Sequence, residues 1–402
     1  MRRHPFPTWS LIALAALALA AVPAVLDLTN DPPSPTPRLV LRSALGKAPF
    51  PGVTTPVVRR GVRKAPQGRP HLRARATAPS LARMIGQQVM VRMDGLSADQ
   101  ALLSRIRHGD VGGVILYSEN IATRGQVKAL IGELQGAARS GGNPPLLIST
   151  DQEGGSVKRL SWAPPSLTPP QMGVAGALAS RRQGQRTGEA LRAVGINVDL
   201  APVLDVARSS SSFIWQQGRS FGMRAPTVIG SAIPFALGLQ SARVAPTGKH
   251  FPGVGGAGTD TDFALETLTS HPADLAPYRV LIADRLPLIM VSTGVYPKLD
   301  RSRVPAALSR TIITGLLRQR MGYQGAVITD DLERPTGYST SDAVVRAARA
   351  GADIILVSTT EQAGGTAYQA LLAAASRGMI PRATVRAAYA RVLALKKAYA
   401  AG

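Results

Sequence analysis

Short runs of apolar and β-branched residues recur along the chain from residue 88 onward, and longer amphipathic stretches separate them. The short runs have the length of buried strands, whereas the longer stretches repeat their apolar positions with the period of a helix. Strands are predicted at residues 88–92, 113–117, 146–150, 197–201, 244–249, 288–292, 326–329 and 353–357. Helices are predicted at residues 123–139, 181–194, 226–242, 305–321 and 341–350.

This alternation predicts a parallel sheet, because parallel strands are joined by crossover connections that usually contain a helix. Eight strands are the number that closes a (β/α)₈ TIM-type barrel, a fold of the α/β class that commonly needs about 250 residues. An open doubly wound sheet is the alternative, but no GxGxxG motif follows the first predicted strand. We therefore expect one barrel domain over residues 79–402.

The N-terminal residues 1–26 have the pattern of an export signal. Arg2 and Arg3 precede an apolar run that extends from Leu11 to Leu26, and 22–24 (Val-Pro-Ala) offers a cleavage site. The run is short for a membrane-spanning helix, which needs about 20 apolar residues. The segment is predicted to be a signal peptide or an uncleaved N-terminal anchor, and either predicts an exported, extracellular or cell-envelope protein.

Residues 27–78 are rich in proline and arginine, a composition that cannot bury a core and predicts a disordered linker. No aspartate or glutamate occurs between Pro32 and Met93. Two interpretations remain open for this basic segment. It either attracts an anionic envelope polymer, a membrane surface or nucleic acid, or it is simply a solvated linker.

The whole chain carries a formal net charge of +23 and contains no cysteine. Disulfides, thiolate catalysis and cysteine-based metal sites are therefore excluded. Basic residues are not interleaved with aromatic ones in the predicted domain, as they are in proteins that bind single-stranded nucleic acid. We therefore expect no nucleic-acid partner.

Polar residues follow several of the predicted strands directly. Asp151 follows the third strand, Asp205 the fourth, and the pair Asp330 and Asp331 the seventh, while the fifth ends in the sequence KHFPG at residues 249–253. Active sites of α/β barrels lie at the carboxyl ends of the strands. The sequence thus predicts a site at this end of the barrel.

Two acidic segments are candidates for the chemistry. Of the pair after the seventh strand, we expect Asp330 to be functional, as a nucleophile or a ligand, and Asp331 to cap the next element. After KHFPG, a glycine-rich loop carries Asp260 and Asp262 and is expected to be mobile. Such a loop beside a strand end is a common way to build a catalytic site.

The segment 151–155 (Asp-Gln-Glu-Gly-Gly) offers acid and amide groups suited to binding the vicinal hydroxyls of a sugar. A Mg²⁺ site is the alternative, but a single acidic pair is weak evidence for one. Arg219 adds a cation that can orient a carboxylate or bind a sugar oxygen, although a structural role is the simpler interpretation of one arginine.

The chain has five histidines, and their positions differ in interest. His250 lies at the predicted site and is expected to orient the substrate or a carboxylate. His271 is expected at the surface beyond the glycine-rich loop. The other three are expected to be incidental: His4, His71 and His108.

Taken together, these motifs resemble the family-3 glycoside hydrolases, in particular the β-N-acetylhexosaminidases that trim cell-wall sugars. The matching stretches occur in the family's order within residues 81–360. They are residues 112–117, 151–155 with Arg159, 195–197 with 201–206, 219–222, 249–253 and 329–332.

The resemblance implies a retaining mechanism in which Asp330 is the nucleophile that forms a covalent glycosyl-enzyme. It also implies a set of residues that hold the sugar, namely Asp151, Arg159, Arg219, Lys249 and His250. The family's acid/base is a histidine on the loop after KHFPG, supported by an aspartate two residues earlier. Here Asp260 keeps the supporting position, but Asp262 stands where the histidine is expected.

Further departures are Val254 and Thr293, where the family has histidines, and residues 333–335, which lack the methionine that normally follows the nucleophile. Asp262 can act as the acid/base if Asp260 raises its pKa, since neighbouring carboxylates resist double ionisation. The predicted function is hydrolysis of terminal β-linked N-acetylhexosamine from cell-wall or chitin-like saccharides, by a monomer without metal or organic cofactor. A catalytically impaired saccharide-binding protein on the same barrel is the alternative.

Overall fold

The structure, a computed structural model, describes residues 79–401, and in this range a parallel sheet closes into a barrel. Its strand order is β10-β1-β2-β3-β6-β7-β8-β9, with all paired neighbours parallel. The two end strands meet through a parallel bridge between Ile328 and Ile354, which closes the barrel. The strands are β1 (Val89–Val91), β2 (Gly113–Ile115), β3 (Leu147–Thr150), β6 (Val198–Asp199), β7 (Ala245–Phe251), β8 (Leu288–Val291), β9 (Ala326–Thr329) and β10 (Ile355–Val357).

The predicted (β/α)₈ barrel is therefore confirmed, and every observed barrel strand overlaps a predicted one. The open doubly wound alternative is wrong for this chain, because β9 is bridged to Ile354, the residue directly before β10. The predicted leader at residues 1–26 and linker at residues 27–78 lie outside the described residues.

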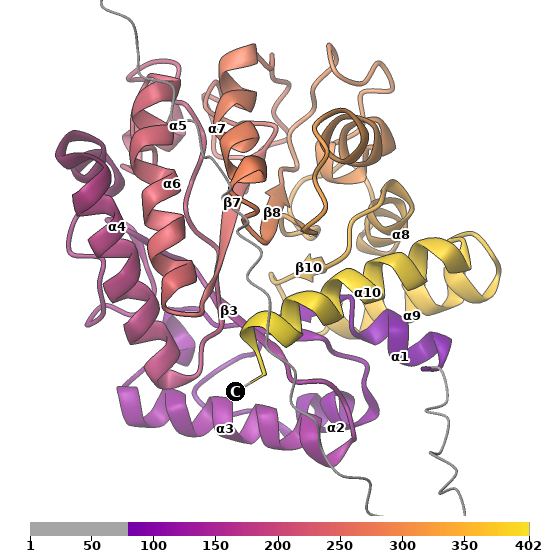
Figure 1. Cartoon of the computed structure of the whole chain (residues 1–402). Helices are drawn as coiled ribbons and strands as arrows, with labels where there is room; N and C mark the ends of the chain where they lie inside the picture. Colours follow the sequence, from indigo (N-terminus) through magenta and orange to yellow (C-terminus); the bar gives the residue numbers. More distant parts are fainter. Residues whose placement is uncertain (1–78, 402) are drawn as a thin grey trace, which may run out of the picture. The chain divides into compact units, whose positions relative to one another are not determined.

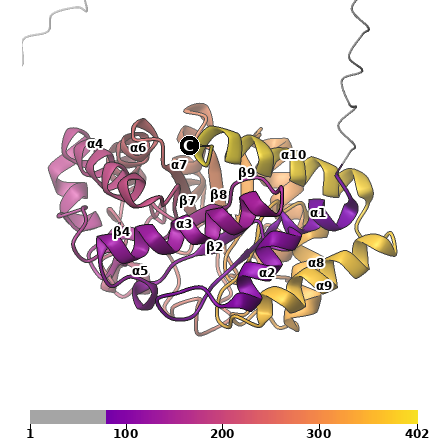
Figure 2. The ribbon, with the colours of Figure 1, turned by 90° about the horizontal axis from the view of Figure 1, so that it is seen from below.

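Helices surround the strands in both views (Figure 1; Figure 2). The longer ones are α1 (Leu81–Gly86), α2 (Gln100–His108), α3 (Arg124–Ser140), α4 (Pro169–Val194), α6 (Ala225–Ser241), α7 (Pro272–Ala283), η3 (Thr311–Arg320), α8 (Thr340–Ala350), α9 (Ala363–Ser376) and α10 (Arg382–Tyr399). Short elements between them are η1 (Ser118–Asn120), α5 (Phe213–Gln216), η2 (Ala306–Leu308) and the hairpin of β4 (Gln152–Gly154) with β5 (Val157–Lys158).

The predicted helices are present, with two differences in extent. Helix α4 is kinked at Gly176, whose φ of +79° is not helical, and the predicted helix at residues 181–194 lies in the part after this kink. The part before it was not predicted, and it begins at Pro169, where Thr168 and Gln171 form a reciprocal capping box and Pro169 suits the first helical position. The segment predicted as one helix at residues 305–321 is divided into η2 and η3. Among the described residues, no helix has the length and apolarity needed to cross a membrane.

The barrel interior is filled by strand side chains such as Met90, Ile115 and Leu147, and α10 adds Leu395 and Tyr399 to this cluster. Helix α10 lies at the amino ends of the strands. A groove beside it is shared with residues that immediately precede or begin β8 and β9, including Pro287, Gly325 and Ala326. Because α10 closes this end, the opposite end of the barrel, where the strands finish, is left for a site.

Candidate active site

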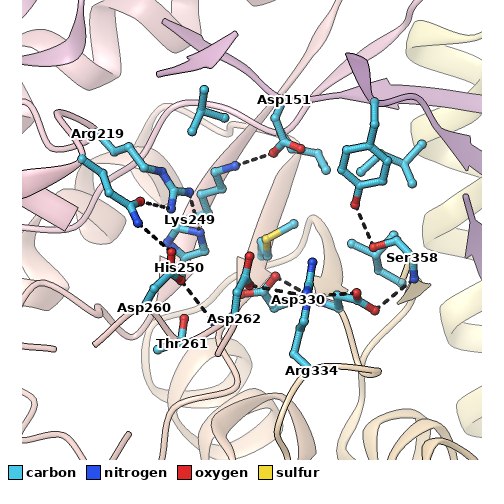
Figure 3. A pocket seen from close by; sticks show the side chains of 18 of the residues that line it. Asp151, Arg219, Lys249, His250, Asp260, Thr261, Asp262, Asp330, Arg334 and Ser358 are labelled. Carbon is cyan, nitrogen blue, oxygen red and sulfur yellow. Dashed lines mark hydrogen bonds and ion pairs between the residues drawn. The ribbon is translucent and has the colours of Figure 1, made fainter. Parts of the chain in front are cut away.

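The carboxyl ends of the strands line a cavity of about 220 Å³. All the residues predicted for the site contribute to its wall, although they come from distant parts of the sequence (Figure 3). They are Asp151, Arg159, Arg219, Lys249, His250, Asp260, Asp262 and Asp330. The structure therefore brings these eight residues together in one site.

Lys249, at the end of β7, is the centre of an ion-pair network. Its Nζ lies 2.7 Å from Asp151 Oδ1 and 2.7 Å from Glu153 Oε1. Arg219 donates from Nε and Nη2 to the two oxygens of Glu153 at 2.9 and 2.8 Å, which is a bidentate pair. These contacts fix both cations beneath the cavity, so little side-chain entropy remains to be lost when a ligand binds.

The network changes the pKa of its members in opposite directions. Burial by itself would raise the pKa of Glu153, but Arg219 and Lys249 lower it to about 2. Burial would lower the pKa of Lys249, but Asp151 and Glu153 raise it above its ordinary value. Glu153 and Lys249 are therefore both charged near neutral pH.

The sequence interpretation of residues 151–155 is partly wrong. Asp151 faces the cavity, but Glu153 is 2% exposed and its two oxygens accept from Arg219. Gln152 is also buried, and its amide bonds within its own loop to Leu160 and Pro164. The polar groups of Glu153 and Gln152 are therefore already hydrogen-bonded within the protein, and these residues support the site without binding a ligand.

Arg159 reaches the cavity from the short hairpin that follows β3. Its backbone N–H donates to Asp151 O at 3.3 Å, and its Nη2 lies 4.0 Å from Asp151 Oδ2. The guanidinium lies over the ring of Tyr117, 5.4 Å from the centroid. Tyr117 in turn donates to Ser358 Oγ at 2.8 Å, so this side of the cavity joins β2 and β10.

His250 is oriented by Asp205, which follows β6. Its Nδ1 lies 2.7 Å from Asp205 Oδ2, and the other oxygen of Asp205 accepts from Val254 N at 2.9 Å. A proton on Nδ1 leaves Nε2 as an acceptor, and Arg219 Nη2 lies 3.5 Å from it. Asp205 thus fixes the imidazole, a role that its strand-end position hinted at but that the sequence did not assign.

Asp330 and Asp331 have different environments. Asp331 is 4% exposed and accepts from the N–H groups of Ser358 and Glu333 and from the Thr359 hydroxyl, so it holds the loop after β9. Asp330 is half-buried and lines the cavity. Burial raises the pKa of Asp330, with a further contribution from Asp331, whereas His250 and Lys249 oppose the change.

The acidic loop after KHFPG places its two carboxylates differently. Asp260 Oδ2 accepts from Gln217 Nε2 at 2.7 Å, and its Oδ1 accepts from the Asp262 backbone N–H at 3.0 Å. Asp262 keeps 42% of its side chain exposed toward the cavity mouth. Asp260 therefore supports the backbone of Asp262, whose own carboxyl is directed into the site (Figure 3).

The pKa of Asp262 is raised to about 6. Burial is the largest cause of this increase, and the negative charge of Asp330 is the second. Arg334 lowers the pKa, and Asp260 raises it by less than Asp330 does. The direction agrees with the sequence prediction, but the cause differs. The main neighbouring carboxylate is Asp330, which lies across the cavity, and not Asp260, which is close in sequence.

The glycine-rich loop is less open than its composition suggested. A Cβ on Gly255 would lie 1.9 Å from Val206 O, and Gly253 has a φ of +129°, so both glycines are required for packing. Val254 is fully buried between them. The exposed glycines are Gly256 and Gly258, so conformational freedom is confined to the outer part of the loop.

Arg334 and Gln217 line the cavity without having been predicted. Arg334 Nε lies 3.3 Å from Asp331 Oδ2 and 3.9 Å from Asp262 Oδ1. His108 is exposed at the end of α2 and His271 is the exposed N-cap of α7, whereas His4 and His71 lie outside the described residues. Within residues 79–401, no group of three or more acidic or histidine side chains is arranged to hold a metal ion.

Chemically, two of the carboxyl groups that line the cavity beside its cationic wall, Asp262 and Asp330, have different surroundings. Asp330 lies near His250 and Lys249, whereas Asp262 lies on the outer loop with a pKa near 6. Two carboxyl groups in unlike environments suit a reaction that needs one as a nucleophile and the other as a proton donor.

Comparison with known proteins adds independent information. Over residues 80–395 the sequence matches the family described as the glycosyl hydrolase family 3 N terminal domain. A β-hexosaminidase of Methylococcus capsulatus is 34% identical over 291 residues, which is 69% of this chain and 83% of that protein. A protein of Arthroderma benhamiae, described as an uncharacterized secreted glycosyl hydrolase, is 36% identical over 80% of this chain and 95% of its own length.

Solved structures show the same architecture. The family 3 β-N-acetylglucosaminidase of Paenibacillus sp. superimposes with a TM-score of 0.76 and 37% identity over 80% of this chain, which spans 63% of that protein. The β-N-acetylhexosaminidase of Beutenbergia cavernae superimposes with a TM-score of 0.74 and 33% identity, over 80% of this chain and 99% of that protein.

Proposed function

The chain belongs to glycoside hydrolase family 3, and we propose that it hydrolyses terminal β-linked N-acetylhexosamine from cell-wall or chitin-like saccharides. One observation carries the proposal. The residues for sugar binding and for both catalytic roles, predicted from separate segments, line one cavity at the carboxyl end of the barrel (Figure 3). The relatives named above support the substrate class.

In this proposal the cationic wall holds the terminal sugar. Asp151, Arg159 and Lys249 offer charge-assisted hydrogen bonds to its hydroxyls, and Arg219 and His250 lie beside them. Their ion pairs with Glu153 and Asp205 hold these groups in place before the sugar binds. Such preorganisation lowers the free-energy cost of binding.

Asp330 attacks the anomeric carbon as the glycosidic bond breaks, which forms a covalent glycosyl-enzyme. Asp262, in its protonated form, donates its proton to the leaving oxygen. In the second step ionised Asp262 takes a proton from water, which attacks the anomeric carbon and releases Asp330. Asp260 supports this exchange by holding the backbone of Asp262.

This assignment predicts an acidic pH optimum. The first step needs protonated Asp262, which is depleted as the pH rises above its pKa of about 6. It also needs ionised Asp330, which is lost as the pH falls. Activity should therefore decline on both sides of an optimum, with an alkaline limb near pH 6.

The test is release of a chromophore from an aryl β-N-acetylglucosaminide between about pH 3.5 and 8, a range that brackets carboxylate and histidine titration. Wild type is compared with Asp330→Ala and Asp262→Ala. We expect a loss of about 10³-fold or more for Asp330→Ala. Activity no higher in wild type than in Asp330→Ala at any pH would leave only the alternative, a non-catalytic saccharide-binding protein.

For Asp262→Ala we expect a loss of about 10²-fold or more on a substrate with a poor leaving group. The loss should be much smaller on a dinitrophenyl glycoside, whose leaving group needs no proton. Asp342→Ala, an exposed aspartate on α8, is the matched control. Full activity of Asp262→Ala on both substrates would refute its assignment as the acid/base.

We further propose that residues 79–402 are the catalytic domain of an exported, monomeric protein whose basic segment at residues 27–78 attracts an anionic envelope polymer or a membrane surface. The secreted description of the Arthroderma relative supports export. Cell fractionation with sequencing of the mature N-terminus would distinguish a cleaved signal from an anchor. Salt-sensitive binding of the full chain to an anionic polymer, lost on removal of residues 27–78, would support the role of the linker.

A further inference from the structure

Arg334 joins the two loops that carry the proposed catalytic carboxylates. It belongs to the segment after β9, four residues beyond Asp330, yet its guanidinium approaches Asp262 on the loop after β7. Both residues line the cavity. Figure 3 shows Arg334 beside Asp330 and Asp262 at the side of the cavity opposite Asp151.

The contact with Asp331 is the closer end of this link. Arg334 Nε lies 3.3 Å from Asp331 Oδ2, an ion pair without hydrogen-bond geometry. Asp331 is itself fixed by hydrogen bonds from Ser358 N at 3.0 Å, Glu333 N at 3.1 Å and Thr359 Oγ1 at 2.8 Å. The arginine is therefore paired with a carboxylate that is itself held in place between the segments that follow β9 and β10.

The other end is loose. Arg334 Nε lies 3.9 Å from Asp262 Oδ1, which is near the limit of an ion pair, and 29% of the arginine side chain and 42% of the aspartate side chain are exposed. Among the described residues, no other cation lies within ion-pairing distance of this carboxyl. A loose contact lets Asp262 turn toward a substrate oxygen and back without breaking a strong bond.

We propose that Arg334 is a positioning residue that holds the Asp262 carboxyl at the cavity mouth and favours its ionised form between the two proton transfers. The proposal rests on the proposed function, since it concerns the same acid/base. In the first step Asp262 gives up its proton to the leaving oxygen, and Arg334 stabilises the carboxylate that results. In the second step the carboxylate accepts a proton from water, and its attraction to Arg334 ends.

The charges around Asp262 give the direction of the effect. Burial, Asp330 and Asp260 raise the pKa of Asp262, whereas Arg334 and, to a smaller extent, Arg219 lower it, with a result near 6. Removing the charge of Arg334 removes an attraction that exists only when Asp262 is ionised. The protonated form then persists to higher pH, so the alkaline limb of the activity profile should move upward.

The experiment measures kcat and KM against pH for the wild-type chain, Arg334→Met and Arg334→Lys with an aryl β-N-acetylglucosaminide. The matched control is Arg346→Met, which removes an arginine stacked on Tyr338 outside the cavity. We expect Arg334→Met to move the alkaline limb of kcat/KM upward by about 0.5–1 pH unit. Arg334→Lys should recover much of the shift, and Arg346→Met should leave the limb in place.

A limb that moves no further in Arg334→Met than in Arg346→Met would overturn the inference, as would a rise in KM alone. If Arg334→Met does not fold, Arg334→Gln removes the same charge and should give the same shift. Failure of the inference is distinguishable from failure of the proposed function. The former leaves a wild-type enzyme that still depends on Asp330 and Asp262, whereas the latter leaves no activity that depends on Asp330.

Discussion

Two buried lysines lie at opposite ends of the barrel, and their surroundings differ sharply. Lys249 and Lys396 are each 2% exposed. At the carboxyl ends of the strands, Lys249 contacts the carboxylates of Asp151 and Glu153. On α10, at the amino ends, Lys396 donates to the amide oxygen of Gln87 at 2.5 Å and has no ion-pair partner among residues 79–401.

The comparison separates the effect of burial from that of partners. Burial lowers the pKa of both lysines, but Asp151 and Glu153 reverse the effect for Lys249, whose pKa is raised. For Lys396 burial acts alone and lowers the pKa to about 7. Lys249 thus keeps its positive charge at the end of the barrel where it can hold a substrate. At the end that α10 closes, the buried charge of Lys396 has no carboxylate partner within the described part of the chain and lowers the stability of the fold.

The largest effect is expected when Lys249 is removed. Lys249→Met leaves Asp151 and Glu153 close together without the cation that now lies between them. Arg219 pairs with Glu153 and so compensates only part of the remaining negative charge. We expect the free energy of unfolding to fall by about 3–5 kcal/mol, with loss of activity. Chemical denaturation at pH 7 measures this. Lys128→Met, at an exposed position on α3, is the control and should change stability by about 0.5 kcal/mol or less.

An opposite and smaller effect is expected at the other end. Lys396→Met removes a buried amine that must either be charged without a carboxylate or lose its proton, so the unfolding free energy at pH 7 should increase by roughly 1–3 kcal/mol. Activity should not change, because Lys396 lies outside the cavity. If the variant is less stable than wild type at pH 7, the amine contributes more through its hydrogen bond to Gln87 than it costs by burial.

The pH dependence provides a second measurement on the same variant. The folded pKa of Lys396 is about 7, below the ordinary value of 10.5, so the unfolded chain binds more protons between these pH values. The contribution of Lys396 to stability should therefore rise as the pH increases from about 7 toward 10. The difference between Lys396→Met and wild type should shrink over the same interval.

The smallest effect is expected when the amino end is made to resemble the carboxyl end. Gln87→Glu places a carboxylate against Lys396, and the amide nitrogen that it replaces has no hydrogen-bond partner among the described atoms. The pKa of Lys396 should rise, and stability at pH 7 should change by only about 1 kcal/mol, since a buried pair gains little over its desolvation cost. A weaker dependence of stability on pH than in wild type is the diagnostic result. An unchanged pH dependence would show that the introduced carboxylate does not pair with Lys396.

Most of the fold was predictable because its signals are local. Residues 326–329, for example, are three apolar residues followed by a β-branched threonine, and the carboxylate of Asp330 comes next. Both the strand and its polar end can therefore be recognised from a few neighbouring residues. The part of α4 before the kink at Gly176 was missed for an equally local reason, since Thr168 and Gln171 form a capping box that was not recognised. The division of residues 305–321 into η2 and η3 has no comparable signal in the periodicity.

The site was predictable as a set of residues but not as a set of contacts. Glu153 and Gln152 have the composition of ligand-binding groups, yet both are satisfied within the protein. Asp205 orients His250 from a neighbouring strand end, and Arg334 reaches Asp262 from another loop. Asp262 and Arg334, which lie in separate segments of the sequence, therefore meet only in the folded chain.

By itself, the sequence determined the barrel, the end of it that carries the site, and eight of the residues that line the cavity. These features follow from periodicity and from the order of strands and polar residues, which neighbouring positions along the chain encode. Only the tertiary structure decided which of those groups are charged and which are held in place. The reason is that a pKa depends on burial and on charges within a few ångströms, and the groups that set it for Lys249, Lys396 and Asp262 come from distant parts of the chain.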